Sequence, residues 1–276
     1  MFIEVLLFIF GLIAGSFLNV CIYRIPIGES VIFPRSHCPK CGEKIAFYDN
    51  IPILSYIILR GKCRKCGEKI SLRYPFVELL NGVLFLILYR EYFFSPSFFL
   101  FLFLSEILIV LAFIDLDHRI LPHFLNFGGM FISLLFSPYN VIIISQSFLG
   151  MKVIKVLGLD VSSFNLPVYI TSFMGAFLGI LLFVIVAVSF YLVKKIEGLG
   201  HGDIVLIGFI GALLGPMLVF YVISIGGIIG GLVGAYLIFI KKKDKMYELP
   251  FGTFLCGTAV LFVLFGMRII SKFLAG

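Results

Sequence analysis

Long apolar stretches alternate with short polar segments along this chain. A helix needs about 20 residues to cross the hydrocarbon core of a bilayer, and on that rule the apolar sequence predicts about eight transmembrane helices. They cover residues 2–23, 75–89, 98–114, 121–137, 168–193, 203–214, 216–240 and 251–271. The expected fold class is therefore an all-α polytopic membrane protein.

The composition supports this class. Hydrophobic residues make up 61% of the chain, charged residues 13%, and the mean hydropathy is +1.14. These values leave too little polar surface for a soluble globule of 276 residues. The first apolar stretch has neither a basic segment before it nor a small-residue cleavage site. We therefore expect it to be retained as a helix, with the mature chain beginning near Met1.

One long polar segment, residues 24–73, separates the first two predicted helices. It carries ten lysines and arginines against four acids, a net charge of +6. By the positive-inside rule this segment is predicted to be cytoplasmic. Threading the chain from there puts 115–121, 194–203 and 241–249 on the same side. Topology and attraction to anionic membrane lipid account for the basic character of the chain, so it does not indicate nucleic-acid binding.

Three parts are expected from this pattern: a first transmembrane helix (1–23), a small cytoplasmic domain (24–73) and a transmembrane core (74–276). The core would carry cytoplasmic loops at 115–123 and 194–203. A domain of about 50 residues is too small to depend on a hydrophobic core alone, and a metal ion would help to stabilise it.

The cytoplasmic segment contains an internal repeat of two C-x-x-C-G knuckles, and each is followed by Glu-Lys-Ile. This spacing predicts a tetrahedral zinc site, whose ligands would be Cys38, Cys41, Cys63 and Cys66. Four protein ligands leave no open position, so the zinc would be structural. Disulfides are the alternative, but the reducing cytoplasm disfavours them. Cys21 and Cys256 lie in apolar stretches and are expected to be small core residues.

Two aspartates lie at the edges of apolar stretches, where an ionisable group is a candidate for function. Asp115 follows the stretch that ends at Ile114, and Asp203 precedes the one that starts at Ile204. The predicted topology puts both at the cytoplasmic face. Such a pair can share a proton and activate water against a peptide carbonyl, and Gly200 and Gly202 would let a substrate backbone approach.

Other interpretations of these residues stay open. Asp203 could simply cap a helix, and Asp117 could pair with Arg119. Carboxylates and imidazoles of the two loops could instead form the metal site of a hydrolase or transporter; these residues are Asp115, Asp117, His118, His123, His201 and Asp203. A third possibility is a non-enzymatic assembly component whose zinc module docks a partner.

Taken together, the motifs resemble a known family, the bifunctional type IV prepilin leader peptidases and N-methyltransferases, which are bacterial GxGD-type aspartic proteases. The resemblance runs almost end to end. Its motifs are Gly15-Ser16-Phe17-Leu18-Asn19-Val20, the paired knuckles, Arg73-Tyr74-Pro75-Phe76-Val77-Glu78-Leu79, Ile114-Asp115 with Leu121-Pro122, Glu197-Gly198-Leu199-Gly200-His201-Gly202-Asp203, and Pro250-Phe251-Gly252.

The resemblance implies a function and a location. Asp115 and Asp203 match the catalytic aspartates of the family, and the four cysteines match its zinc-binding domain. The implied reaction is cleavage of the leader of a prepilin or pseudopilin, followed by methylation of the new N-terminus with S-adenosylmethionine. The implied location is the bacterial inner membrane, with the zinc domain and both aspartates on the cytoplasmic side.

Some details are left less defined. Glu78 is a candidate for contact with the substrate amine, or it could interact with the positive end of its own helix. No Rossmann-type glycine fingerprint is present, so the residues that bind the methyl donor are not assigned. The chain departs from the family pattern at His123, where aspartate is common, and at Val205, where lysine is common.

Overall fold

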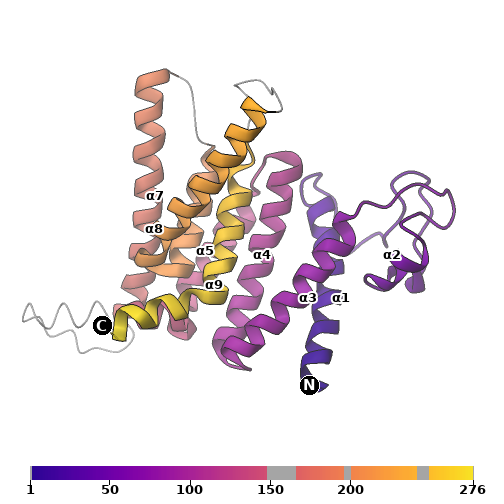
Figure 1. Cartoon of the computed structure of the whole chain (residues 1–276), viewed down its shortest axis with the longest axis horizontal. Helices are drawn as coiled ribbons and strands as arrows, with labels where there is room; N and C mark the ends of the chain where they lie inside the picture. The colour runs from indigo at the N-terminus through magenta and orange to yellow at the C-terminus, as the bar shows by residue number, and fades with distance from the viewer. Residues whose placement is uncertain (1, 148–165, 196–199, 241–248, 276) are drawn as a thin grey trace, which may run out of the picture. The chain divides into compact units, whose positions relative to one another are not determined.

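The described part of the chain is almost entirely helical (Figure 1). The structure is a computed structural model that describes residues 2–147, 166–195, 200–240 and 249–275. Within these ranges the only strand-like pairings are two isolated bridges, His37 with Lys44 and Lys62 with Lys69. The all-α fold class is therefore confirmed. The chain divides into two compact units, Met1–Phe94 and Ser95–Gly276.

Unit 1 contains two long helices, α1 (Phe2–Arg24) and α3 (Arg73–Tyr92). Glycines let their backbones approach closely, because a Cβ atom on Gly15 would lie 2.7 Å from the Cα of Glu78. Asn81 Nδ2 donates a hydrogen bond to the Gly11 carbonyl, at 3.0 Å. Small residues and polar side chains of this kind are the usual means by which helices associate in a membrane.

The zinc-binding segment expected at 24–73 lies between these helices in sequence. Its helical elements are short, η1 (Phe47–Asn50) and α2 (Leu54–Ile58). The rest consists of loops that carry the two knuckles. The structure groups α3 with α1 in unit 1, whereas the sequence pattern predicts residues 74–276 as one transmembrane core.

Unit 2 begins with α4 (Pro96–His118), which Ser95 caps by accepting a hydrogen bond from the Phe98 amide. It continues with α5 (His123–Leu135), η2 (Ser137–Tyr139) and a helical segment at 141–147. The last three helices are α7 (Leu166–Lys194), α8 (His201–Phe239) and α9 (Phe251–Ala275). The lysine cluster at 241–245 and part of the expected loop, residues 196–199, lie outside the described residues.

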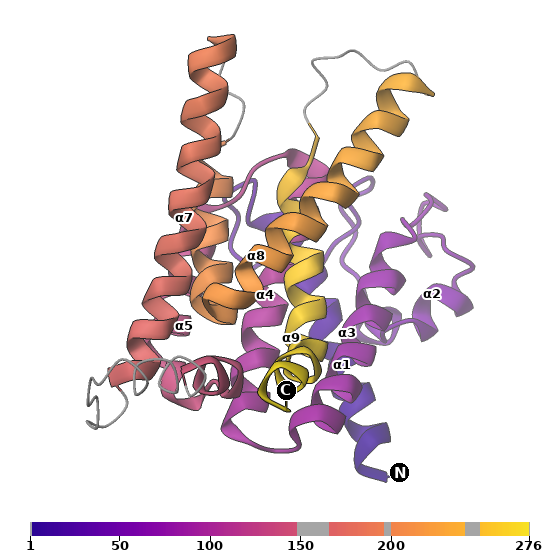
Figure 2. The ribbon, with the colours of Figure 1, turned by 60° about the vertical axis from the view of Figure 1, so that its left-hand side comes forward.

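Helix α8 is broken in its middle at Gly215, whose φ of 79° is not helical, and Pro216 follows it. Figure 2 shows the chain turning back there, so that the segments before and after Gly215 extend toward the same side of unit 2. This break separates the two helices that were expected at 203–214 and 216–240. Side chains satisfy the carbonyls that the break releases: Ser172 donates to Ala212, Asn140 to Leu213 and Gln146 to Leu214.

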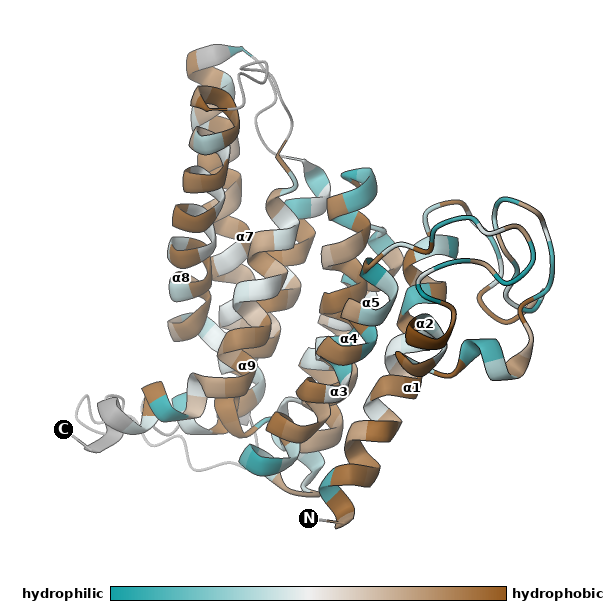
Figure 3. Cartoon of the chain, turned by 45° about the vertical axis from the view of Figure 1, so that its right-hand side comes forward, coloured by the Kyte–Doolittle hydropathy of each residue, from teal (hydrophilic) through white to brown (hydrophobic). Residues whose placement is uncertain are grey.

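Among the described residues, five helices are long and apolar enough to cross a membrane, namely α1, α4, α7, α8 and α9. Figure 3 shows that the helices consist mainly of hydrophobic residues and that hydrophilic residues gather at helix ends and in the knuckle region. The expected spans at 75–89 and 121–137 correspond to α3 and α5. Helix α5 has only 13 residues, a length of about 20 Å, which is short of the hydrocarbon thickness of about 30 Å.

Helices α7 and α8 pack through facing glycines, which gives a test of the fold. A Cβ atom on Gly211 would collide with the carbonyl of Gly175, whereas one on Gly227, also in α8, would meet nothing within 4 Å. We expect Gly211→Ala to destabilise the protein by about 1–3 kcal/mol through overpacking. Gly227→Ala should be neutral, or stabilising by up to about 1 kcal/mol. Thermal unfolding in detergent compares the two, and equal midpoints would contradict the packing.

Candidate active site and metal centre

Asp115 lies in the last turn of α4 and is 5% exposed. Its Oδ2 accepts a hydrogen bond from the backbone N–H of Thr253, at 2.7 Å. The Thr253 hydroxyl lies 3.1 Å from the same oxygen and 2.9 Å from the Ala112 carbonyl, so its single proton serves one acceptor at a time. Thr253 is in the first turn of α9, where backbone N–H groups have no partner within the helix. Asp115 is thus held by the start of α9.

Asp203 lies in the first turn of α8, which begins at His201 with Gly200 as its N-cap residue. Asp203 is therefore the third residue of the helix and not its N-cap residue. The Asp203 amide donates to the Gly200 carbonyl, at 3.1 Å. The carboxylates of Asp115 and Asp203 lie close enough for their charges to interact. The structure thus brings together two acids that are 88 residues apart in sequence.

Leu121 connects the motifs around these acids. A Cβ atom on Gly202 would lie 2.9 Å from Leu121 Cβ, and one on Gly252 would lie 3.0 Å from Leu121 Cδ1 and 3.1 Å from Asp115 Oδ2. The absence of a side chain at both glycines therefore leaves room for Leu121 and for the carboxylate. Gly202 packs against the Leu121 side chain, whereas a Cβ atom on Gly200 would meet only the Asp203 carboxylate.

Asn126, on α5, is a neighbour of the site that the sequence analysis missed. It is fully buried, and its Nδ2 lies 3.4 Å from the Gly202 carbonyl. Its Oδ1 is buried without a hydrogen-bond partner among the described residues. A lone asparagine in an apolar stretch gives no sequence signal that would have singled it out.

The alternative metal site in the loops does not form in the described part of the chain. There, the four cysteines are the only group of at least three His, Cys, Asp or Glu side chains placed to hold an ion together. His118, His123 and His201 are exposed, and so is Asp117. The burial of Asp115 beside exposed Asp117 favours Asp115 as the functional acid of this pair.

In unit 1, the four cysteine sulfurs lie within 4.8 Å of one another, and those of Cys38 and Cys66 are 3.9 Å apart. Tetrahedral coordination with Zn–S bonds of about 2.3 Å requires sulfurs about 3.8 Å apart. The predicted ligand set, Cys38, Cys41, Cys63 and Cys66, is thus assembled with dimensions that fit zinc.

The two knuckles have the same backbone structure. The Cys38 N–H donates to the backbone carbonyl of Glu43 at 2.9 Å, and the Cys63 N–H donates to the backbone carbonyl of Glu68 at 2.8 Å. The glycine of each knuckle, Gly42 or Gly67, has φ near 70° and donates to the carbonyl of the first cysteine. A left-handed residue is required in this turn, which explains glycine in both copies.

The knuckle backbone also favours thiolate formation. Backbone N–H groups of Cys66 and Lys65 lower the pKa of the Cys63 thiol to about 7. The pKa of Cys66 is raised to about 12, because the Glu68 amide, which lowers it, is outweighed by desolvation and by hydrogen bonds with the other cysteines. The free cluster therefore keeps protons on some of its sulfurs. A metal ion would displace these protons, since the thiolate is the ligand form.

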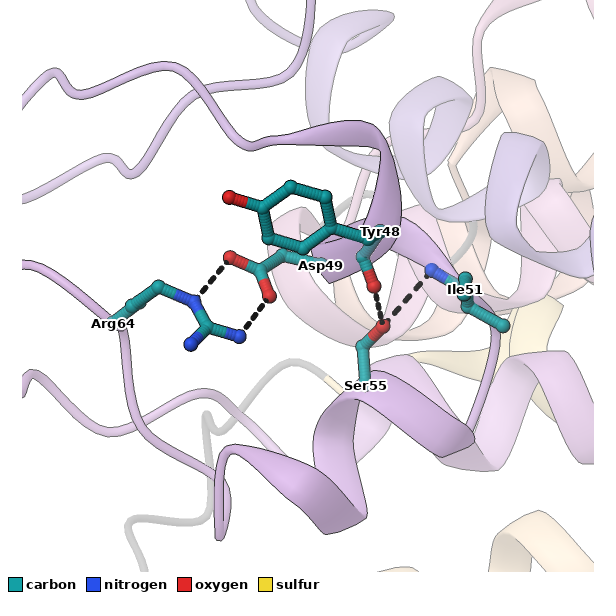
Figure 4. Close-up of polar contacts among 5 residues, drawn as sticks. All are labelled: Tyr48, Asp49, Ile51, Ser55 and Arg64. Carbon is teal, nitrogen blue, oxygen red and sulfur yellow. Dashed lines mark hydrogen bonds and ion pairs between the residues drawn. The ribbon is translucent and has the colours of Figure 1, made fainter.

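An ion pair ties η1 to the second knuckle (Figure 4). Arg64 donates to both carboxylate oxygens of Asp49, at 2.8 and 2.6 Å, and lies over the Tyr48 ring. The Arg64 guanidinium lowers the pKa of the Asp49 carboxyl through these hydrogen bonds. Ser55 donates to the Tyr48 carbonyl and accepts from the Ile51 amide, which fastens α2 to η1.

Glu78 lies in the second turn of α3 and is 8% exposed. Its carboxylate accepts a hydrogen bond from the Ile53 amide at 2.8 Å and another from Ser16 of α1. Both partners belong to unit 1, so Glu78 connects the loop before α2 to the two long helices. A contact with a substrate amine remains a prediction for this residue.

Two family models match the chain. The "Bacterial Peptidase A24 N-terminal domain" covers residues 9–92, and the "Type IV leader peptidase family" covers residues 102–235. Their boundaries agree with the two structural units, Met1–Phe94 and Ser95–Gly276.

Curated relatives carry the name prepilin leader peptidase/N-methyltransferase. One from Legionella pneumophila is 32% identical over 96% of this chain and 92% of its own length. One from Pseudomonas putida is 30% identical over 96% of this chain and 91% of its own length. One from Myxococcus xanthus is 38% identical over 85% of this chain, a match that spans 63% of that protein. No solved structure was found to match the chain.

Proposed function

Since this chain belongs to the type IV leader peptidase family, we propose that it cleaves leader peptides from type IV prepilins or pseudopilins and N-methylates the new N-terminal residue. The observation that carries the peptidase proposal is the placement of Asp115 and Asp203 in one cluster with Leu121, Gly202 and Gly252. The names of the relatives support the methyl transfer, for which S-adenosylmethionine is the proposed donor.

In the proposed mechanism, the two aspartates share one proton. The ionised carboxylate takes a proton from a water molecule as the water oxygen bonds to the scissile carbonyl carbon, and the protonated one gives its proton to the carbonyl oxygen. The resulting diol collapses as a proton returns to the amide nitrogen, and the C–N bond breaks. Gly200, exposed beside Asp203, would allow the extended leader to approach.

We further propose that this reaction takes place at the cytoplasmic face of the bacterial inner membrane. The support is the net charge of +6 on residues 24–73, because such segments remain on the cytoplasmic side. In unit 2, Leu121 contacts both Gly202 and Gly252, so three helix ends that the threading assigns to one face do lie together. The apolar segment of a pilin would then lie in the bilayer, with its leader junction at the aspartates.

The four cysteines are proposed to hold a structural zinc ion that stabilises residues 24–73. All four positions of a tetrahedral ion would be filled by protein, so it would take no part in hydrolysis. The chemistry of cleavage therefore rests on unit 2 alone.

The purified protein, incubated with a prepilin and analysed by mass spectrometry, tests both activities. Without S-adenosylmethionine, the expected product is the pilin shortened by its leader; with it, the same product gains the mass of one methyl group. An intact prepilin under both conditions would contradict the proposal, and cleavage without the methyl group would limit it to the peptidase.

The contact between Thr253 and Asp115 gives a prediction within this mechanism. Thr253→Val removes the hydroxyl at similar side-chain shape but keeps the backbone N–H that Asp115 accepts. A hydrogen bond to a charged group contributes about 1.5–3 kcal/mol, so kcat for leader cleavage should fall about ten- to a hundred-fold with KM little changed. Thr253→Ser, which restores the hydroxyl, should restore kcat. If both variants were equally slow, the residue would be needed for packing rather than for holding the carboxylate.

A further inference from the structure

Helix α2 presents an apolar face to its surroundings. Leu54, Ile57 and Ile58 are 50%, 64% and 62% exposed, and their spacing puts all three on one side of the helix. Ser55 lies on the other side, is 7% exposed, and makes the hydrogen bonds that fasten α2 to η1 (Figure 4). The apolar side of α2 is therefore held outward, and Figure 3 shows the helix as hydrophobic.

The hydrogen bond between Glu78 and Ile53 fixes where this face lies along α3. Ile53 directly precedes α2, and Glu78 is five residues after Arg73, the first residue of α3. The Glu78 Cα lies about 7.5 Å along α3 from Arg73, and its side chain leans toward the start of the helix, so α2 begins beside the first two turns of α3. At this level α3 itself exposes Phe76 and Leu79, 56% and 46% exposed. The apolar side chains of α2 thus lie at the depth where α3 becomes apolar.

Three cations lie on the other side of α2, the side that carries Tyr56. Arg60, Lys62 and Lys69 line an open cavity of about 460 Å³ together with Tyr56 and Ser71. None of the three cations has an ion-pair partner in the part of the chain that the structure describes. A cavity of this composition suits phosphate groups.

Two acids nearby cannot neutralise this charge, because other cations of the module already hold them. Asp49 is bound by Arg64 at 2.6 Å, and Glu68 lies 3.9 Å from Lys40. The segment around α2 therefore combines an apolar side with uncompensated positive charge on the opposite side.

We propose that α2 is an interfacial anchor: Leu54, Ile57 and Ile58 insert among the lipid headgroups, and the cations on the polar side of α2 bind the phosphates of anionic lipid. An apolar helix face with Lys and Arg on the opposite, polar face is the known signature of a segment that lies in the plane of a membrane. The anchor would hold the zinc module against the bilayer. The inference rests on the membrane embedding of α1, to which α3 packs, and not on the catalytic proposal.

The absence of tryptophan from the chain allows a direct test. Ile57→Trp introduces a single tryptophan on the proposed face, and Ile45→Trp introduces one in the first knuckle, at a residue that is 38% exposed. Each full-length variant is reconstituted into phosphatidylcholine and phosphatidylglycerol vesicles with brominated acyl chains. The bromines should quench the fluorescence of the Ile57→Trp protein at least about two-fold more than that of the Ile45→Trp protein. Water-like emission from the Ile57→Trp protein, or shielding of its indole only when a prepilin is added, would overturn the anchor.

A second comparison tests the cations. In the Ile57→Trp protein, changing Arg60, Lys62 and Lys69 to glutamine should reduce quenching in anionic vesicles to its level in phosphatidylcholine alone. A control that changes Arg35, Lys44 and Lys65 to glutamine removes the same charge elsewhere in the module, and it should keep the stronger quenching. If the two triple variants lost the same amount of quenching, the effect would come from net charge alone, and the proposed phosphate site would be wrong.

Discussion

Asp115→Asn and Asp203→Asn are each expected to lower the rate of leader cleavage by about a thousand-fold or more, because each removes one half of a proton-sharing pair. Asparagine keeps the shape of the side chain but can neither take a proton from water nor give one to the carbonyl oxygen. The measurement is cleavage of a prepilin by purified variant in detergent or proteoliposomes, quantified by mass spectrometry.

Two controls separate chemistry from folding in this experiment. Asp117→Asn changes an exposed acid two residues from Asp115 and should leave cleavage near the wild-type rate. Methylation of a pilin that has already lost its leader should persist in both dyad variants, since the proposed chemistry of the aspartates ends with cleavage. Wild-type cleavage by either dyad variant would end the peptidase mechanism proposed here, whatever became of methylation.

The cysteine cluster could be predicted from the sequence because each pair of cysteines is local. In C-x-x-C-G, one tight turn brings the two sulfurs of a knuckle together. Only the contact between the two knuckles depends on the tertiary structure. The sulfur distance of 3.9 Å between Cys38 and Cys66 confirms that contact. The break in α8 was also predictable, because Pro216 lacks a backbone N–H and Gly215 tolerates the non-helical φ that precedes it.

The surroundings of Asp115 could not be predicted in the same way. Thr253 is 138 residues from its acceptor, and a threonine after Pro-Phe-Gly has no local feature that indicates a partner on α4. The length of α5 was overestimated too: the apolar stretch suggested 121–137, but the helix begins only after Pro122 and ends at Leu135. An apolar sequence indicates which residues are kept from water, but it does not show where the loop before a helix ends and the helix begins.

The cysteine cluster carries the second large prediction, because residues 24–73 contain little regular structure apart from η1 and α2. Binding of structural zinc to small domains contributes about 10–16 kcal/mol at neutral pH. A module so poor in helices and strands has few other interactions to replace that contribution. Its two knuckles also carry lysines beside the sulfurs, and these lysines would repel one another once the sulfurs of the metal-free module became protonated.

Cys63→Ser is therefore expected to remove the bound metal and unfold residues 24–73 while the transmembrane helices remain folded. Limited trypsin digestion should then cut at lysines and arginines of this segment that are protected in the wild type, and metal analysis should fall from one zinc per chain to none. Cys21→Ser and Cys256→Ser are matched controls, since these cysteines are buried in α1 and α9, away from the cluster. Full protection of residues 24–73 in metal-free protein would show that the knuckles fold without an ion.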